Sequence, residues 1–354
     1  MSVAILENYE LHAYNTFAVS ACARYFCAVH NVDELRHALA VATQLDVPVL
    51  VMGGGSNLLF VQDFPGLVIH MAMQGIQTSC VEEPSVIVTA EAGDNWHHFV
   101  TYCLQQGYFG LENLALIPGN VGAAPVQNIG AYGVELKDFF VELTALLIDS
   151  GEIVSMNLQQ CRFGYRDSIF KQELKNRAVI LSVSFRLSRE PCANIAYGSL
   201  QTALANHAQP IRPADVFAAV CAIRRSRLPD PTVLGNAGSF FKNPIISVAD
   251  YALLLDKYPD LPSYPVHSES SSDTSSKHGI ENRELIKIPA AWLIEKSGWK
   301  GKRLGAVGVH TEQALVLVNH GGGSGHQLLD LATRISESVA AAFGIKLEPE
   351  VRVL

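Results

Sequence analysis

The chain has 354 residues, of which 49% are apolar and 17% are charged, a composition typical of a globular protein with substantial hydrophobic cores. Its formal net charge is −8, so there is no overall basic field for nucleic acid, and an anionic ligand must be held by local cations and backbone N–H groups. No apolar run reaches the roughly 18 residues of a membrane helix, and no apolar leader is visible, so we expect a soluble protein.

The cysteines argue against a disulfide framework and against a metal site. They are scattered, odd in number and form no Cys-x-x-Cys pair. The seven positions are Cys22, Cys27, Cys80, Cys103, Cys161, Cys192 and Cys221. We therefore expect reduced thiols, no bound metal and a cytoplasmic location.

The N-terminal third shows two helix-and-strand pairs. A helix is predicted from Asn31 to just before Pro48, and the apolar stretch 49–52 is predicted to be a strand. Residues 85–89 are rich in β-branched side chains and predict another strand. Asp94 is the expected cap of the helix that follows.

Further elements alternate irregularly along the middle of the chain. Strands are predicted at 144–148 and 179–187, and a helix from Pro213 to about 225. This irregular order predicts an α+β fold rather than a doubly wound sheet. Residues 263–284 are rich in Ser, His and charge, so we expect them to form a mobile surface insertion.

The C-terminal end is predicted to be a helix followed by a strand. Residues 325–343 place apolar side chains on one helical face, and Gly344 is the expected cap. If residues 345–353 form a strand, Ile345, Leu347, Val351 and Val353 share one face. Glu350 and Arg352 then lie side by side on the other.

Three glycine-rich stretches are the candidates for ligand binding. The first, residues 53–57, follows a strand, where glycines let backbone N–H groups approach an anion, but it matches neither the dinucleotide nor the Walker A pattern. A tight strand-exit turn is the alternative. The second, residues 117–136, has few charges and suits close approach to a large flat ligand; a buried structural loop is the alternative.

The third glycine-rich stretch, residues 235–244, sets Ser239 between glycines and two aromatic residues. One interpretation is a hydroxyl held in a dry pocket, and the other is a surface turn before a strand. The stretch lacks a Gly-x-Ser-x-Gly elbow, so a hydrolase triad is not indicated.

Taken together, these stretches resemble the UDP-N-acetylenolpyruvoylglucosamine reductases, flavoenzymes with a vanillyl-alcohol-oxidase-like FAD fold. The resemblance covers nearly the whole chain, and six motifs occur in the family's order. They are Asn15-Thr16-Phe17, residues 53–57, residues 117–136, Gly164-Tyr165-Arg166-Asp167-Ser168, residues 235–244 and Glu348-Pro349-Glu350-Val351-Arg352.

The resemblance implies an FAD-dependent oxidoreductase. It would use NADPH to reduce the enolpyruvyl ether of a UDP-aminosugar to UDP-N-acetylmuramate, a step of peptidoglycan precursor synthesis. Ser239 would be the proton donor, and Arg166 with Glu350 would polarise the enolpyruvyl carboxylate. Glu350 has three open roles: orienting Arg166, orienting a water molecule, or being protonated itself. NADPH would leave before the substrate binds at the same face.

The resemblance also assigns binding residues. Those for non-covalently bound FAD are Gly53, Gly54, Gly55, Ser56, Asn57, Ile117, Pro118, Gly122, Ala123, Asn128, Gly130, Ala131, Tyr132, Gly133 and Arg224. Those for substrate are Tyr197, Arg227, Asn243, Tyr264, Lys287, Gln313 and Arg352, with Tyr264 in a loop that covers the UDP group. Arg227 stands where the family usually has Lys; it keeps the charge but favours bidentate phosphate contacts.

The expected architecture is a two-part FAD-binding domain and a substrate domain in a monomer that binds small molecules and no nucleic acid. The parts are residues 1–75, 76–215 and 226–335, with residues 345–354 returning to the first part. Two rival functions fit part of the pattern: an oxidase of the same fold, which would reoxidise flavin with O₂, and a nucleotide-binding module without catalysis, which would not need Ser239.

Overall fold

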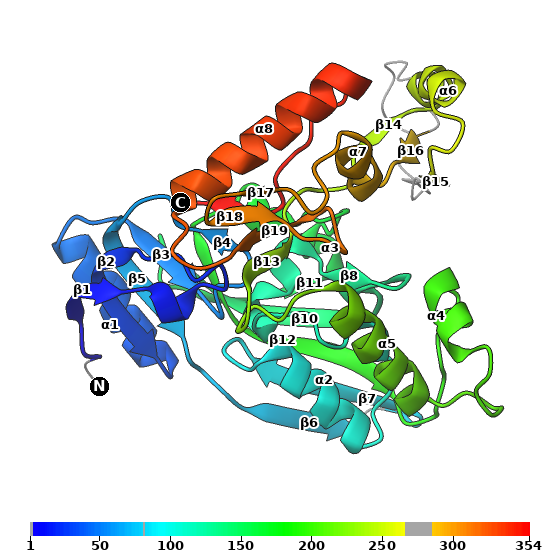
Figure 1. Ribbon diagram of the computed structural model, residues 1–354. Helices are drawn as coiled ribbons and strands as arrows, with labels where there is room; N and C mark the ends of the chain where they lie inside the picture. Colours follow the sequence, from blue (N-terminus) through cyan, green and yellow to red (C-terminus); the bar gives the residue numbers. More distant parts are fainter. Residues whose placement is uncertain (1–2, 81, 266–284) are drawn as a thin grey trace, which may run out of the picture.

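The computed structural model describes residues 3–80, 82–265 and 285–354 (Figure 1). Its first sheet has the order β1-β2-β5-β3, in which β2, β5 and β3 are parallel and β1 is antiparallel to β2. The strands are β1 (Leu6–Glu10), β2 (Cys22–Val29), β3 (Val49–Met52) and β5 (Phe64–Met71). Helix α1 (Val32–Gln44) packs on this sheet, and Asn31, where the predicted helix begins, caps it by accepting a hydrogen bond from the Glu34 N–H at 2.9 Å.

A second, fully antiparallel sheet has the order β11-β10-β12-β7-β6. Its strands are β6 (Ile76–Cys80), β7 (Ser85–Glu91), β10 (Phe140–Leu147), β11 (Ile153–Asn157) and β12 (Ala178–Ser188). Helices α2 (Trp96–Gln105), α4 (Gly198–Leu204) and α5 (Pro213–Arg227) contribute to the core under it, and α3 (Leu158–Cys161) follows β11.

The predicted cap of α2 was wrong by one residue. Asn95 caps the helix by accepting from the His98 N–H at 3.0 Å, whereas Asp94 accepts from the backbone N–H groups of Gly75 and Glu91. Both residue types can cap a helix. Asp94 does not cap α2 because its carboxylate already accepts from the backbone N–H groups of Gly75 and Glu91.

The C-terminal part holds a third sheet, ordered β13-β19-β18-β17, and a small sheet, ordered β14-β16-β15. The third sheet consists of β13 (Gly235–Ser239), β17 (Arg303–Leu304), β18 (Val307–Val309) and β19 (Val316–Asn319). The small sheet consists of β14 (Ile245–Ser247), β15 (Tyr264–Pro265) and β16 (Leu285–Lys287), with α6 (Val248–Lys257) beside it. Helices α7 (Ala290–Lys296) and α8 (Gly325–Phe343) pack on each other.

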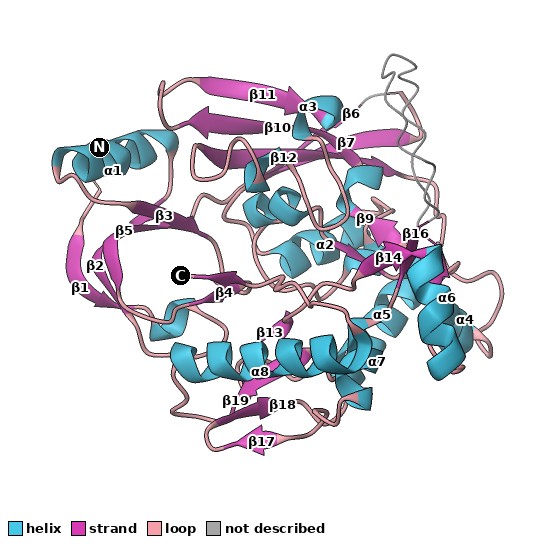
Figure 2. Cartoon of the chain, turned by 90° about the horizontal axis from the view of Figure 1, so that it is seen from above, coloured by secondary structure: helices cyan, strands magenta, loops and turns pink. Residues whose placement is uncertain are grey.

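The C-terminus lies between the sheets rather than at the edge of the molecule (Figure 2). Strand β20 (Arg352–Val353) pairs in parallel with β4 (Leu58–Leu59), directly after the first glycine-rich loop. A single hydrophobic core joins the two ends of the chain, because Leu11 and Phe17 are buried in the same cluster as Phe240 and Val351. This return of the chain end brings residues 349–352 to the centre of the molecule.

The predicted strand 345–353 is mostly wrong, although α8 and its cap Gly344, with φ of +70°, are confirmed. Only β20 is a strand, because the chain before β20 makes just one isolated bridge, from Pro349 to Phe241, with the Lys242 N–H donating to the Glu348 carbonyl and the Glu350 N–H to the Phe240 carbonyl. Ile345, Leu347 and Val351 are buried, but Val353 is 36% exposed, so the expected apolar face is broken.

Within the described ranges no helix is both long and apolar enough to cross a membrane. Most of the predicted insertion 263–284 lies outside the residues that the structure describes. The short strands β8 (Gly130–Ala131) and β9 (Val134–Glu135) form a hairpin in the second glycine-rich stretch.

Candidate functional site

A cavity of about 420 Å³ opens where the first two sheets meet the end of the chain. Its walls are residues 53–58 of the first glycine-rich loop, residues 118–129 of the second, residues 170–180, and residues 349–352. Segments from four separate parts of the sequence therefore enclose one space of a size typical of cofactor sites.

The first loop is shaped by contacts that exclude side chains. Gly55 has φ of +61°, and a Cβ atom there would lie 1.9 Å from the carbonyl oxygen of Tyr14. A Cβ on Gly54 would lie 2.9 Å from Oδ1 of Asn120, in the second loop. The glycines thus let the two loops lie close together and leave the backbone of the first loop accessible at the cavity wall, where N–H groups can approach an anionic ligand.

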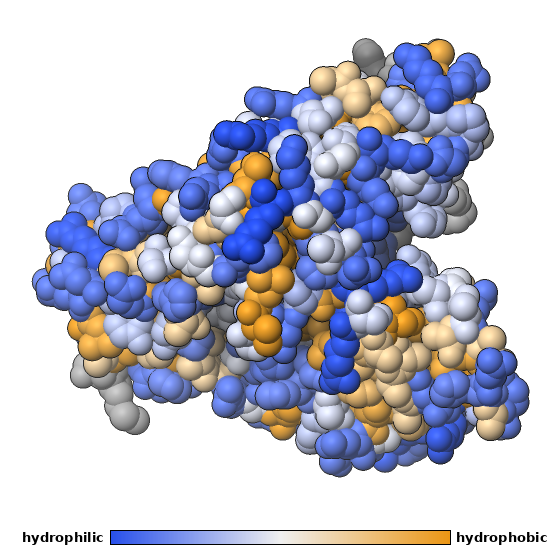
Figure 3. Space-filling model, viewed as in Figure 1, coloured by the Kyte–Doolittle hydropathy of each residue, from blue (hydrophilic) through white to orange (hydrophobic). Residues whose placement is uncertain are grey.

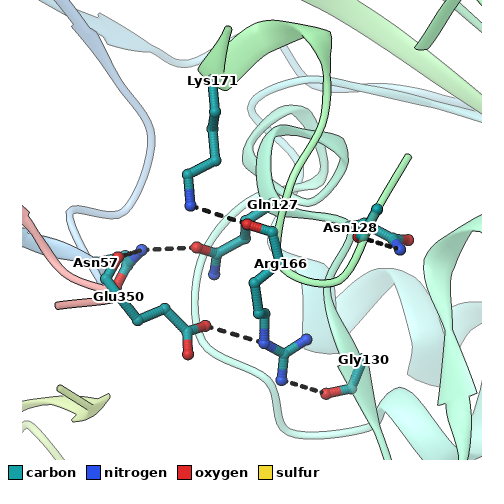
Figure 4. Close-up of polar contacts among 8 residues, drawn as sticks. Asn57, Gln127, Asn128, Gly130, Arg166, Lys171 and Glu350 are labelled. Carbon is teal, nitrogen blue, oxygen red and sulfur yellow. Dashed lines mark hydrogen bonds and ion pairs between the residues drawn. The ribbon is translucent and has the colours of Figure 1, made fainter. Parts of the chain in front are cut away.

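Asn57 ties the loops to the end of the chain. Its Nδ2 donates to Oε1 of Gln127 at 2.8 Å and to the carbonyl oxygen of Glu350 at 3.2 Å (Figure 4). The backbone N–H of Arg352 in turn donates to the Asn57 carbonyl at 3.0 Å. One side chain therefore sets the relative position of both loops and of Glu350.

The second loop is built from tight turns around buried groups. A Cβ on Gly122 would lie 2.5 Å from Cβ of Ala92, so only glycine fits there. Asn128 has φ of +43° and is fully buried; its Nδ2 donates to Oε2 of Glu135 at 2.8 Å and to the Gly164 carbonyl at 3.1 Å. In the structure the Asn128 side chain shapes the loop.

Arg224 and His97 hold the start of the second loop from outside the cavity. Leu116, which precedes Ile117, has φ of +59°, and its N–H donates to Nδ1 of His97 at 3.1 Å. Nε of Arg224 donates to the Leu116 carbonyl at 3.2 Å, and the Arg224 side chain lies against Tyr132. Burial and neighbouring cations lower the pKa of His97, which keeps Nδ1 free to accept.

Arg166 occupies a strained backbone position. It is the third residue of a turn, in which the Gly164 N–H donates to the Asp167 carbonyl at 3.0 Å, and its φ is +54°. Its Nη2 donates to the Gly130 carbonyl at 2.8 Å, and its Nε lies 3.1 Å from Oε1 of Glu350 (Figure 4). The Nε–H does not point along this ion pair, so it is a buried donor without an aligned acceptor among the described residues.

Glu350 is largely withdrawn from water, with 13% of its side chain exposed. Burial raises the pKa of its carboxyl group, and the cations Arg166, Lys171 and Lys242 act in the opposite direction. Its backbone N–H donates to the Phe240 carbonyl at 2.7 Å. Because Phe240 follows Ser239, this bond holds Glu350 and Ser239 on neighbouring segments.

Ser239 lies at the end of a strand, not in a surface turn before one. Strand β13 pairs with β19, where Ser239 is opposite Val316, and the register shifts between Asn236 and Ser239 at Gly238, which has φ of +68°. The Ser239 side chain is partly exposed. Gln313 belongs to the same edge, because its carbonyl accepts from the Val316 N–H at 3.0 Å.

The other expected substrate residues lie in separate places. Tyr197 is influenced by the charges of Tyr264 and Arg227, so these three are close to one another. Tyr197 precedes α4 and Tyr264 lies in β15. Figure 3 shows a recess between the part of the molecule that carries α4 and the lobe that carries α6. Both tyrosines are exposed, at 42% and 47%.

Lys287 and Asn243 both lie close to Tyr165, and Lys287 pairs with Tyr264 in the small sheet. Nζ of Lys287 is 4.8 Å from the ring centroid of Tyr165, the residue before Arg166. Oδ1 of Asn243 accepts from the Ala290 N–H at 2.9 Å, so part of this side chain serves the fold. Arg352 is separate from the set: it lines the cavity, and its Nη2 donates to Oδ1 of Asn176 at 3.0 Å.

Two lysines near Glu350 were missed by the sequence-based prediction. Lys171 and Lys242 line the cavity and face Glu350. Lys242 lies three residues after Ser239, and Lys171 five residues after Arg166, so both were adjacent to motifs already recognised. A basic residue close after each catalytic candidate was the available signal.

Comparisons with known proteins agree with this geometry. Residues 23–157 match a family described as FAD binding domain, and residues 230–354 match one described as UDP-N-acetylenolpyruvoylglucosamine reductase, C-terminal domain. The chain is 48% identical to the UDP-N-acetylenolpyruvoylglucosamine reductase of Pseudomonas fluorescens (strain Pf0-1), over 99% of both proteins. It is 46% identical to that of Chromobacterium violaceum (strain ATCC 12472), over 100% of both.

A solved structure supports the fold. The crystal structure of UDP-N-acetylenolpyruvylglucosamine reductase from Thermus caldophilus superposes with a TM-score of 0.66 at 22% sequence identity, covering 99% of this chain and 98% of that one. The predicted α+β class, with an FAD-binding part followed by a C-terminal domain, is confirmed.

Proposed function

The chain belongs to the UDP-N-acetylenolpyruvoylglucosamine reductase family, and from this premise we propose that it uses NADPH and FAD to reduce UDP-N-acetylglucosamine enolpyruvate to UDP-N-acetylmuramate. The observation that carries the proposal is the partly buried Arg166 guanidinium, held between Gly130 and Glu350, whose buried Nε–H has no aligned acceptor among the described residues. A buried donor of this kind is costly unless a ligand uses it, and a carboxylate is the ligand that a guanidinium favours.

The cavity fits FAD. Its glycine loops exclude side chains where Cβ atoms would collide with Tyr14, Asn120 and Ala92, and its walls are mostly apolar. Residues 53–57 and 118–123 would hold the pyrophosphate through backbone N–H groups, and Arg352 adds a cation to the same cavity. Bound FAD would take a hydride from NADPH and pass it to the substrate.

Three side chains of this protein would then take part in reducing the double bond of the substrate. Arg166 binds the enolpyruvyl carboxylate and stabilises the negative charge that develops there, because a fixed donor in a dry site needs no reorganisation. Glu350 keeps the guanidinium in place. Ser239, next to the residue that bonds Glu350, donates the proton to the second carbon.

The substrate's UDP group would lie along the recess toward Tyr197, Arg227 and Tyr264. These residues approach one another from α5, the segment before α4, and β15. Arg227 offers a bidentate partner for a phosphate, and the tyrosines offer flat faces and hydroxyl groups for the nucleoside. Lys287 and Asn243 would bridge this region to Arg166.

We further propose that the protein is a cytoplasmic monomer. Six cysteine side chains that the structure describes are free thiols, as a reducing compartment favours. An oxidase of similar fold and a binding module without catalysis are the competing functions. The ion pair between Arg166 and Glu350, together with Ser239, favours a reductase over these two functions. Neither an oxidase nor a binding module needs to hold a substrate carboxylate next to a proton donor.

The test is product identification under anaerobic conditions. The purified chain, NADPH and UDP-N-acetylglucosamine enolpyruvate should give a product heavier by two hydrogen atoms, and Arg166→Met should slow its formation by roughly 10²-fold or more. Arg162→Met is the matched control, because Arg162 is exposed and pairs with Glu173. NADPH oxidation that requires O₂ and leaves the sugar unchanged would contradict the proposal.

A further inference from the structure

Lys171 makes an unusual contact at the centre of the site. It ends a 3₁₀ turn, Ile169–Lys171, and its Nζ donates to the backbone carbonyl of Arg166 at 3.0 Å (Figure 4). The side chain is partly buried and lines the cavity. Burial lowers the pKa of its ammonium group, with Lys242 acting in the same direction and Glu350 opposing it. A cation is thus held at the carbonyl oxygen of the residue whose own side chain carries the proposed reaction.

The backbone of Arg166 needs such support. At the third position of its turn, with φ of +54°, a glycine would be unstrained, whereas an arginine is held in a rarely populated conformation. A strained residue stays in place only when its surroundings determine its position from several sides. For Arg166 these are the Gly130 carbonyl, the Glu350 carboxylate and the Lys171 ammonium.

The three contacts hold different parts of Arg166, two its side chain and one its backbone. Gly130 and Glu350 hold the guanidinium, while Lys171 holds the peptide unit that follows the Cα atom of Arg166. If this peptide unit rotated, the Arg166 side chain would no longer point toward Gly130 and Glu350. The positive charge of Lys171 also faces Glu350, together with Arg166 and Lys242. Lys242 shares this second role but has its own ion pair with Glu348, at 3.6 Å.

We propose that Lys171 is a positioning residue for the reduction of the substrate: its ammonium group fixes the left-handed turn at Arg166 and thereby aims the guanidinium at the enolpyruvyl carboxylate. This inference rests on the proposed function. Lys171 acts through Arg166, so its contribution belongs to the half-reaction in which charge develops on the substrate. Reduction of FAD by NADPH does not require the Arg166 guanidinium in that position and is unaffected.

The test compares Lys171→Met with Lys242→Met in anaerobic stopped-flow experiments. Both variants remove a cation facing Glu350, but only the first removes the bond to the Arg166 carbonyl. Lys171→Met should slow flavin reoxidation by substrate about tenfold to hundredfold, the usual effect of losing a charged hydrogen bond, with flavin reduction by NADPH unchanged. Lys242→Met should slow it much less. Lys171→Arg, which keeps charge and donor, should restore most of the lost rate.

Two further measurements separate positioning from a structural role. FAD content and substrate affinity, measured by titrating the oxidised enzyme without NADPH, should change far less than the rate of reoxidation. The charged and titratable groups facing Glu350 are Arg166, Lys171, Lys242 and Tyr165. Removing the Lys171 charge raises the pKa of Glu350, so the limb of the pH profile for reoxidation that Glu350 controls should move to higher pH: the acidic limb if the ionised form is active, the basic limb if the protonated form is active.

Equal reoxidation rates in the Lys171→Met and Lys242→Met variants would overturn the inference, as would equal slowing of both half-reactions or loss of FAD from Lys171→Met. If the Met variant does not fold, a folded Lys171→Arg variant with reoxidation as slow as that of Arg166→Met would overturn it as well. A wild-type enzyme that the substrate fails to reoxidise would contradict the proposed function itself, whereas a normal wild type with an unaffected Lys171→Met contradicts only the role of Lys171.

Discussion

At the scale of single residues, the site depends on three groups from distant segments. Arg166 and Glu350 come within 3.1 Å, and the Phe240–Glu350 backbone bond joins Glu350 to the segment that carries Ser239. The sequence pattern drew attention to Ser239 and Glu350, but only the resemblance to a family joined them with Arg166, because nothing in their spacing predicts contact. Lys171 was not predicted because its partner is a backbone carbonyl, which a sequence pattern does not identify; its position five residues after Arg166 was the only signal.

The role of Ser239 can be separated from binding. Its hydroxyl is proposed to act only when the substrate is protonated, so Ser239→Ala should leave FAD binding and flavin reduction by NADPH nearly intact. Reoxidation of the flavin by substrate should fall by roughly 10²-fold or more, the usual contribution of a positioned proton donor. Stopped-flow absorbance follows the two steps separately. A variant that slows both steps equally, or loses FAD, would show that Ser239 belongs to the cofactor scaffold.

At the scale of elements, local patterns predicted the regular helices and central strands well. Helices α1 and α8 and strand β3 have the predicted bounds within a few residues. Predictions failed where contacts with distant segments determine whether a segment forms a strand. Residues 235–239 form a strand because β19 pairs with them, although glycines usually weaken strands. Residues 345–351 do not form one, because they meet a neighbouring segment only at the single bridge between Pro349 and Phe241.

The contact between His97 and the second loop predicts a pH dependence. Nδ1 of His97 can accept from Leu116 only in the neutral ring, and burial lowers its folded pKa below the ordinary value of about 6.5. A group with a depressed folded pKa stabilises the fold above its unfolded pKa. This contribution is lost as the pH falls below about 6.5 and through the lower folded value.

Thermal unfolding of the FAD-loaded protein, followed by flavin fluorescence at about pH 7.5 and 5.5, measures this effect. When the pH is lowered between these two values, the midpoint temperature of unfolding should fall more for the wild type than for His97→Gln, by on the order of 2 °C. His98→Gln is the matched control, because His98 is the exposed neighbour on the same helix. Other buried histidines contribute equally to each protein. Equal falls in the unfolding midpoint of the wild type and of His97→Gln would show that His97 does not stabilise the second glycine-rich loop.

At the scale of the whole molecule, three sheets meet around the end of the chain, and the cavity lies at this junction. The α+β class could be predicted from the irregular order of elements. The junction could not, because it depends on β20 pairing with β4 and on a core shared by the two ends of the chain. The division at residues 75 and 215–226 remains a prediction, with each larger sheet formed within one of the three predicted parts.

The cavity predicts how the cofactor is attached. Among the described residues that line it, none is a histidine or cysteine, the side chains that commonly tether a flavin. FAD should therefore be held without a covalent bond. Acid precipitation of the purified protein should release yellow cofactor into the supernatant, and flavin that stays in the pellet would disprove non-covalent binding.

The central claim is that one cavity supports both reduction of the flavin and reduction of an enolpyruvyl ether. Anaerobic stopped-flow absorbance of the wild-type protein tests it directly. NADPH alone should bleach the flavin, and UDP-N-acetylglucosamine enolpyruvate added to the bleached enzyme should restore the oxidised spectrum without O₂, in proportion to the product formed. A bleached enzyme that only O₂ can reoxidise, or a chain that purifies with no flavin and binds none, would contradict it.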